Sequence, residues 1–216
     1  MIALLKKDIF VMDKQMRLMV ILALFFLLLP NGGSYGSPYT ALISVMLPMS
    51  TISYDERCKW DRYAAMLPWT PQQIVGSKYI LSYVATVASI LMVLAAYLIR
   101  PLYSDEVVIW EDVWSMLGIY LGVLVVMTAV IYPLMYRFGT ERGRLILVAI
   151  FVGIFIVFFG AAVLLVENVK HLALWLGEIP APVLAVAAAL VVAVGSFLSY
   201  RLSVRFYLRR REGAYT

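Results

Sequence analysis

Residues 18–54 read LMVILALFFLLLPNGGSYGSPYTALISVMLPMSTISY and contain no Asp, Glu, Lys or Arg. A helix that spans a membrane needs about 20 mostly apolar residues, so this stretch is too long for one ordinary span. It is interrupted at residues 30–38 by PNGGSYGSP, a composition that is typical of a turn. We therefore expect two spans, at 18–30 and 39–54, that form a hairpin. Both arms are short, so we expect them either to extend into their flanks or to sit tilted and partly in a thinned interface.

Four further stretches also lack charged side chains, and each is long enough for one crossing. They lie at residues 79–99, 113–136, 145–166 and 179–200. The chain is 63% hydrophobic and 14% charged, whereas soluble domains carry about 25% charged residues, so an ordinary soluble domain is excluded. The predicted fold class is an all-α membrane protein with six transmembrane helices, at 18–30, 39–54, 74–100, 113–137, 145–166 and 183–204.

The basic residues indicate how these helices are oriented. With six spans and a cytoplasmic N-terminus, all but two of the 18 Lys and Arg lie in inner segments, and the exceptions are Arg100 and Lys170. The positive-inside rule therefore predicts that both termini are cytoplasmic, in a multi-pass protein of the inner (cytoplasmic) membrane. This orientation accounts for the net charge of +5, so no nucleic-acid partner is expected.

Residues 1–17 show an amphipathic pattern. Apolar residues recur at spacings of three and four from Ile2 to Met16, and so share one face of a helix. Basic residues fall largely on the remaining faces, namely Lys6, Lys7, Lys14 and Arg17. Arg17 lies one turn after Asp13, so the two side chains can pair. We predict a helix that lies along the cytoplasmic surface of the bilayer; the alternative is a simple extension of the first span.

The longest inner loop, residues 55–78, is rich in charges of both signs. We expect a short helix within 55–69, ended by Pro68, which disfavours helix in the residue before it. Thr70, Pro71 and Gln73 then form a capping box that begins the next helix. A folded cytoplasmic helix with an aromatic face favours docking of a partner protein, and the alternative is a helix that rests on lipid. The candidate docking residues are Asp55, Glu56, Arg57, Lys59, Trp60, Asp61, Arg62 and Tyr63.

Two other features complete the predicted organisation. Residues 167–182 indicate a small outer helix before the sixth span, with a plain loop as the alternative. Within the spans, polar side chains are few, and those singled out are Ser82, Thr86, Ser89 and Thr128. They either line a transport pathway or hold helices together, and the second role is the commoner one.

Few residues could support catalysis. The only histidine is His171 and the only cysteine is Cys58, and no P-loop, HExxH or GxSxG motif occurs. We therefore predict no catalytic residues, no metal site and no cofactor bound by this chain, which is not expected to be an enzyme.

The order of these parts resembles that of ABC-2 type permeases over the whole chain. The segment from Tyr54 to Tyr63, followed by Leu67-Pro68 and residues 74–80, is similar to one branch of that family. Members of that branch carry an acidic pair, a Trp, a Leu-Pro and a Lys-Tyr in this loop. The branch is associated with exporters of amphipathic peptides, such as the phenol-soluble modulin exporter.

The resemblance implies a single transmembrane domain over 1–216, in which the helix that starts at Asp55 is a coupling helix. Two copies of a separate ATP-binding subunit would dock on it and bind ATP and Mg, and a second permease copy or a paralogue would complete the pathway. Other readings stay open: the membrane subunit of an energy-coupling-factor importer, an ABC-2 exporter of lipids or drugs, a membrane-embedded enzyme, or an assembly protein.

Overall fold

The computed structural model describes residues 2–28, 32–64, 66–99, 101, 110–164 and 181–213. These residues form helices and no strand, which confirms the predicted all-α class. The helices are α1 (Ile2–Leu28), α2 (Gly32–Arg57), α3 (Trp60–Ala64), α4 (Pro71–Ile99), α5 (Trp110–Phe138), α6 (Thr140–Leu164) and α8 (Ala181–Gly213).

Three helices of the described chain are both long and apolar enough to cross a membrane. They are Pro71–Ile99 in α4, Val113–Phe138 in α5 and Val186–Arg210 in α8. The helices α1, α2 and α6 have 27, 26 and 25 residues, which exceeds the length of about 20 residues that one crossing requires. The structure therefore supports a membrane protein, while the count of six spans stays a prediction.

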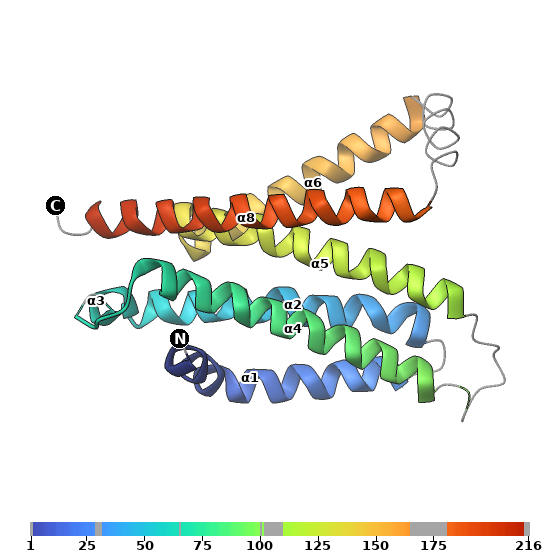
Figure 1. The fold of residues 1–216 in the computed structure, drawn as a ribbon, viewed down its shortest axis with the longest axis horizontal. Helices are drawn as coiled ribbons and strands as arrows, with labels where there is room; N and C mark the ends of the chain where they lie inside the picture. Colours follow the sequence, from blue (N-terminus) through green and yellow to red (C-terminus); the bar gives the residue numbers. More distant parts are fainter. Residues whose placement is uncertain are drawn as a thin grey trace.

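The helix bounds differ from the predicted ones around the first hairpin. α2 begins at Gly32, so part of the predicted turn at 30–38 is helical. α1 runs without a break through the predicted interfacial helix and first span, although Figure 1 shows its N-terminal end turned away from the axis of the rest. A helix satisfies its own backbone hydrogen bonds, which favours helical extension wherever water is excluded. Most of the predicted outer helix, 167–182, lies outside the described residues.

Figure 1 shows α3, the junction between α5 and α6, and both ends of the chain at the same end of the bundle. We call this the α3 end. α2 packs against both α1 and α4, and α5 packs against α6 and α8. The larger cluster of buried side chains joins Leu4, Ile74, Tyr132 and Tyr207, from α1, α4, α5 and α8. Ala64 of α3 belongs to this cluster, so the cluster is continuous with α3 and the residues that flank it, 55–64 and 66–69, which we call the α3 element.

Candidate functional site

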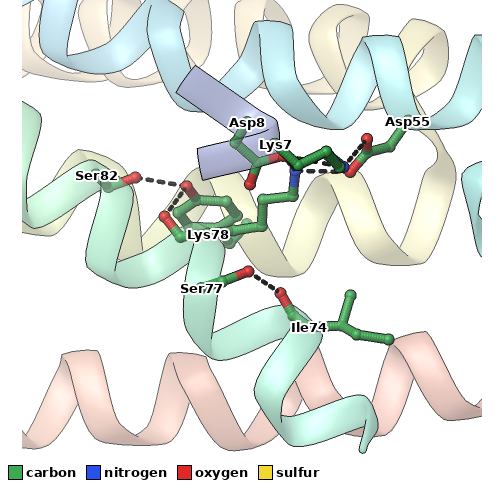
Figure 2. A network of polar contacts seen from close by, with 8 residues as sticks. Lys7, Asp8, Asp55, Ile74, Ser77, Lys78 and Ser82 are labelled. Atoms are coloured by element: carbon green, nitrogen blue, oxygen red, sulfur yellow. Dashed lines mark hydrogen bonds and ion pairs between the residues drawn. The ribbon is translucent and has the colours of Figure 1, made fainter. Parts of the chain in front are cut away.

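Four charged side chains from three helices meet beneath α3, and we call them the charge cluster: Lys7 and Asp8 of α1, Asp55 of α2 and Lys78 of α4. Lys78 Nζ lies 2.7 Å from Asp8 Oδ1 and 2.6 Å from Asp55 Oδ2. Lys7 Nζ lies 2.6 Å from Asp55 Oδ1 and 3.0 Å from Asp8 Oδ1. Figure 2 shows both lysines directed at the two carboxylates.

The cluster is deeply buried at its centre, since the side chains of Lys78 and Asp8 are 3% and 2% exposed. A buried charge is costly unless it is paired, and here two cations face two anions. α4 begins at Pro71, which places Lys78 about two turns inside the helix rather than at its end. Asp8 and Asp55 therefore compensate the buried ammonium group of Lys78. These ion pairs also fix the positions of α1 and α2 against α4.

The pKa of Lys7, in the first turns of α1, is shifted by the charge cluster. Burial lowers the pKa of its ammonium group, but the carboxylates of Asp55 and Asp8 raise it, and the balance lies above the usual 10.5. Lys7 is thus charged at neutral pH. Its Nζ lies 4.2 Å from the centre of the Trp60 ring, which is a cation–π contact. The charge cluster is therefore directly connected to α3.

The α3 element departs from the single helix that was predicted over 55–69. α2 continues through Arg57, Lys59 adopts a left-handed backbone conformation with φ 50°, and the short α3 then begins at Trp60. Ala64 is buried, and Trp60 packs against Trp69 with ring centroids 6.2 Å apart. Continuous helix would require a right-handed conformation at Lys59, so the left-handed residue accounts for the break. Trp60 is an anchor that holds α3 on the bundle.

The start of α4 confirms the predicted capping box. The Thr70 backbone N–H donates to Gln73 Oε1 at 3.2 Å, and the Gln73 backbone N–H donates to Thr70 Oγ1 at 3.3 Å. Pro71 is the first residue of α4. Tyr200 of α8 donates to the Gln72 carbonyl at 3.1 Å, so α8 also contacts this first turn.

Glu56, the neighbour of Asp55, joins a different set of helices. Its Oε2 accepts a hydrogen bond from the backbone N–H of Thr140, at the start of α6, at 2.9 Å, and its Oε1 pairs with the guanidinium of Arg210 in α8. Gly139 precedes α6 with φ 81°, a conformation that glycine adopts without strain. Burial raises the pKa of Glu56, but the Thr140 hydrogen bonds and Arg210 lower it below 4.5 on balance.

The predicted docking residues therefore divide into two groups. Those that contact other helices or the core are at least half-buried: Asp55, Glu56, Trp60 and Asp61. Burial raises the pKa of the Asp61 carboxyl above 3.8, although Arg210 and a hydrogen bond from Tyr207 oppose this. Those that face outward are Arg57, Lys59, Arg62 and Tyr63. The outward face of the α3 element is thus basic and aromatic.

The structure also shows where the other predicted residues lie. Lys6, Lys14 and Arg17 of the predicted interfacial helix are exposed, and Arg17 pairs with Asp13 at 2.7 Å as expected. The polar residues of the spans are all buried, namely Ser82, Thr86, Ser89 and Thr128. Ser82 contacts the hydroxyl of Tyr132, whereas Ser89 and Thr128 donate to carbonyls of their own helices. This burial among helices favours packing over lining of a pathway within one chain.

Sequence reasoning gave no site role to Asp8 or Tyr132, and it named Lys78 and Tyr79 only as the Lys-Tyr of the family motif. Tyr132 donates to the Lys78 carbonyl at 2.7 Å and stacks on Tyr79 with ring centroids 4.4 Å apart. The hydroxyl of Tyr79 in turn lies 2.7 Å and 2.9 Å from Ser199 and Ser203 of α8. Asp8 lies one turn from both Leu4 and Met12, which are buried, and this spacing was the signal that could have placed it on the protein-facing side.

Comparison with known protein families gives a match over most of the chain. A family model described as ABC-2 family transporter protein matches residues 3–208. No curated protein and no solved structure matches the chain. Within the part of the chain that the structure describes, no group of three or more His, Cys, Asp or Glu side chains is placed to hold a metal ion.

We expect Lys78→Met to destabilise the protein by about 3–5 kcal/mol, because it leaves two buried carboxylates with a single cation. The double variant Lys78→Met with Asp8→Asn restores neutrality, so it should lose less than Lys78→Met alone. The measurement is unfolding in mixed detergent micelles. The matched control is Arg17→Met, which removes an exposed pair and should cost no more than about 0.5 kcal/mol. Equal losses in Lys78→Met and Arg17→Met would contradict a stabilising role for the cluster.

The lowered pKa of Glu56 predicts a pH dependence with a definite sign. Its ionised form contributes stability that is complete above pH 4.5 and lost as the pH falls through the lower pKa of the folded state. The melting temperature of the wild type should therefore exceed that of Glu56→Gln at pH 6, and the two should converge as the pH falls below 4.5. The control Glu141→Gln alters an exposed carboxylate of the same region and should follow the wild type throughout. A constant gap between wild type and Glu56→Gln down to pH 3 would rule out this linkage.

Proposed function

The chain belongs to the ABC-2 family of transporter proteins, and on this premise we propose that it is the permease subunit of an ATP-driven exporter. The proposed cargo is an amphipathic or hydrophobic peptide that leaves the cytosol. The observation that carries the proposal is an α3 element which presents a basic, aromatic face outward and is anchored inward on the charge cluster.

We propose that α1, α2, α4, α5, α6 and α8 all cross the inner membrane, with both termini in the cytosol. Support comes from Figure 1, in which both termini, α3 and the α5–α6 junction lie at one end of the bundle. Basic residues gather in these same segments, as the positive-inside rule requires of a cytoplasmic side. The α3 end is then the cytoplasmic end.

The energy source in this proposal is a separate ATP-binding subunit, present in two copies, which binds ATP and Mg and carries out hydrolysis. The sequence of this chain contains no P-loop of its own. A second permease copy or a paralogue completes the transport pathway. The exposed residues of the α3 element, above all Arg62, Tyr63 and Met66, form the docking face for the ATP-binding subunit.

The contacts beneath α3 suggest how a displacement of the docked element reaches the membrane helices. Trp60 contacts Lys7, Lys7 pairs with Asp55 and Asp8, and these two carboxylates hold Lys78 of α4. Because each buried charge depends on its partners, the four groups are constrained to move together or to exchange partners as a set. A shift of α3 would therefore change the packing of α1, α2 and α4 together.

Support for the peptide cargo comes from the sequence of the α3 loop. The segment Asp55 to Tyr63, followed by Leu67-Pro68, resembles permeases that export amphipathic peptides. Related permeases handle lipids or drugs, so these compounds are the competing cargoes in any transport measurement.

The docking face predicts the effect of surface substitutions. Arg62→Glu and Tyr63→Ala should each reduce the amount of ATP-binding subunit that copurifies with the chain by roughly tenfold, because exposed Arg and Tyr are common binding hot spots. Their melting temperatures should stay within a few degrees of the wild type. The matched control is Trp114→Ala, which removes an aromatic side chain of the same 62% exposure from the first turns of α5, at the opposite end of the bundle. Unchanged copurification of both α3 variants would refute docking at this face.

The proposed cargo predicts ATP-dependent transport in one direction. Inside-out vesicles that contain the chain and its ATP-binding subunit should accumulate a fluorescent amphipathic helical peptide, and a scrambled peptide of equal composition should not accumulate. Transport should be lost when the catalytic site of the ATP-binding subunit is inactivated. Transport of a fluorescent lipid or a drug in place of the peptide would replace the cargo assignment, and the permease role would stand.

A further inference from the structure

A polar cleft opens at the α3 end, between the C-terminal part of α2 and the start of α6. It consists of two adjoining cavities of ≈ 180 and ≈ 330 Å³ that share Ser53, Arg57 and Arg144. Gln15 of α1 and Tyr54 of α2 line the smaller cavity, and Arg142 of α6 lines the larger one. A water molecule occupies about 30 Å³ in the liquid, so the cleft has room for a much larger polar group.

Three guanidinium groups give this cleft its charge. Among the described residues, Arg57 and Arg142 make no ion pair, and both are exposed. Arg144 donates to Ser53 Oγ at 2.8 Å, and both residues line the two cavities, so this bond restrains the guanidinium within the cleft. We call these three residues the arginine cleft.

Two carboxylates also line the larger cavity, Glu56 and Glu141. Both oxygens of Glu56 are already engaged by Arg210 and the Thr140 backbone. Glu141 makes no ion pair with the residues that the structure describes. With Glu56 engaged elsewhere, one carboxylate faces three guanidinium groups, so the cleft retains an excess of positive charge.

This arrangement suits a phosphate group. Arginine binds phosphate oxygens through two parallel N–H donors, and several arginines on different helices can surround one phosphate. The Tyr54 hydroxyl and the Gln15 amide supply further hydrogen-bonding groups; Gln15 Nε2 already donates to Ser50 Oγ at 2.9 Å. The chemical class of ligand is thus a phosphate monoester or diester.

The position of the cleft favours a lipid as the source of that phosphate. Arg57 follows the apolar stretch 18–54, and Arg144 precedes the apolar stretch 145–166, so both lie where apolar helix meets the polar region. Leu145 and Val148, just beyond Arg144, are 71% and 58% exposed and can face acyl chains. Basic pockets between membrane helices at this depth recognise anionic headgroups.

We propose that the arginine cleft binds the phosphate headgroup of an anionic phospholipid. This site goes beyond the proposed transport role and does not depend on it. Its assignment to the cytoplasmic leaflet rests on the proposed orientation, whereas the phosphate chemistry does not. A bound headgroup would bridge Arg57 of α2 to Arg142 and Arg144 of α6, beside the junction that Glu56 already joins.

The test uses the full chain in a neutral detergent, offered equal amounts of phosphatidylglycerol and phosphatidylcholine, with retained lipid measured by native mass spectrometry. The wild type should retain phosphatidylglycerol in preference. The double variant Arg57→Gln with Arg142→Gln should lower that preference by roughly tenfold or more, because two charges that attract the headgroup are lost. Both side chains are exposed, so the melting temperature without lipid should not change. Arg142→Lys, which keeps the charge, should retain a large part of the preference.

The matched control is the double variant Arg205→Gln with Arg209→Gln, which removes two exposed arginines of α8 that lie outside the cleft. Its lipid preference should equal that of the wild type. An equal loss in this control would mean that net charge alone attracts the lipid, and would overturn the site. Inorganic phosphate forms the second arm: displacement of phosphatidylglycerol by low millimolar phosphate would overturn the lipid source in favour of a soluble phosphate compound. The absence of any preference for phosphatidylglycerol in the wild type would overturn the proposal as a whole.

Discussion

A lysine ammonium group that is 3% exposed requires counter-charges inside the protein, and Lys78 finds them on two other helices. This requirement links Asp8 of α1 and Asp55 of α2 to α4, and Lys7 completes a cluster of balanced charge. An apolar contact would tolerate small shifts between these helices. Paired buried charges do not, because a separated partner would be left without compensation in a medium of low dielectric constant. At the α3 end, these ion pairs therefore restrain how α1, α2 and α4 pack against one another.

Two neighbouring residues at the end of α2, Asp55 and Glu56, connect α2 to four other helices. Asp55 enters the charge cluster with α1 and α4, whereas Glu56 holds the start of α6 and Arg210 of α8. α5 is joined through Tyr132, which stacks on Tyr79 and donates to the Lys78 carbonyl. α3 begins four residues after Glu56, so the element proposed to receive mechanical input lies where contacts to the six long helices that the structure describes converge. Four of the eight residues that the sequence predicted as a docking surface, Asp55, Glu56, Trp60 and Asp61, thus support α3 from within.

The contacts of the site that the sequence predicted are those between residues close together in the chain. The capping box of Thr70 and Gln73 and the ion pair of Asp13 and Arg17 both follow from spacing along a single helix or turn, and both are present. The division of residues 55–63 into buried and exposed members did not follow, because it depends on the left-handed Lys59 and on the position of Trp60 over Lys7. Contacts of that kind join residues far apart in the chain, and no local pattern specifies them.

By itself, the sequence determined that the chain is helical and belongs in a membrane, because apolar stretches of this length can satisfy their backbone groups there only as helices. The distribution of Lys and Arg further indicated an orientation. Only the tertiary structure decided which charged side chains are buried. Asp8 and Lys78 are 70 residues apart, and each looks like an ordinary flanking charge until the two helices meet. A buried ion pair is a property of two surfaces in contact, so its presence depended on how the helices pack.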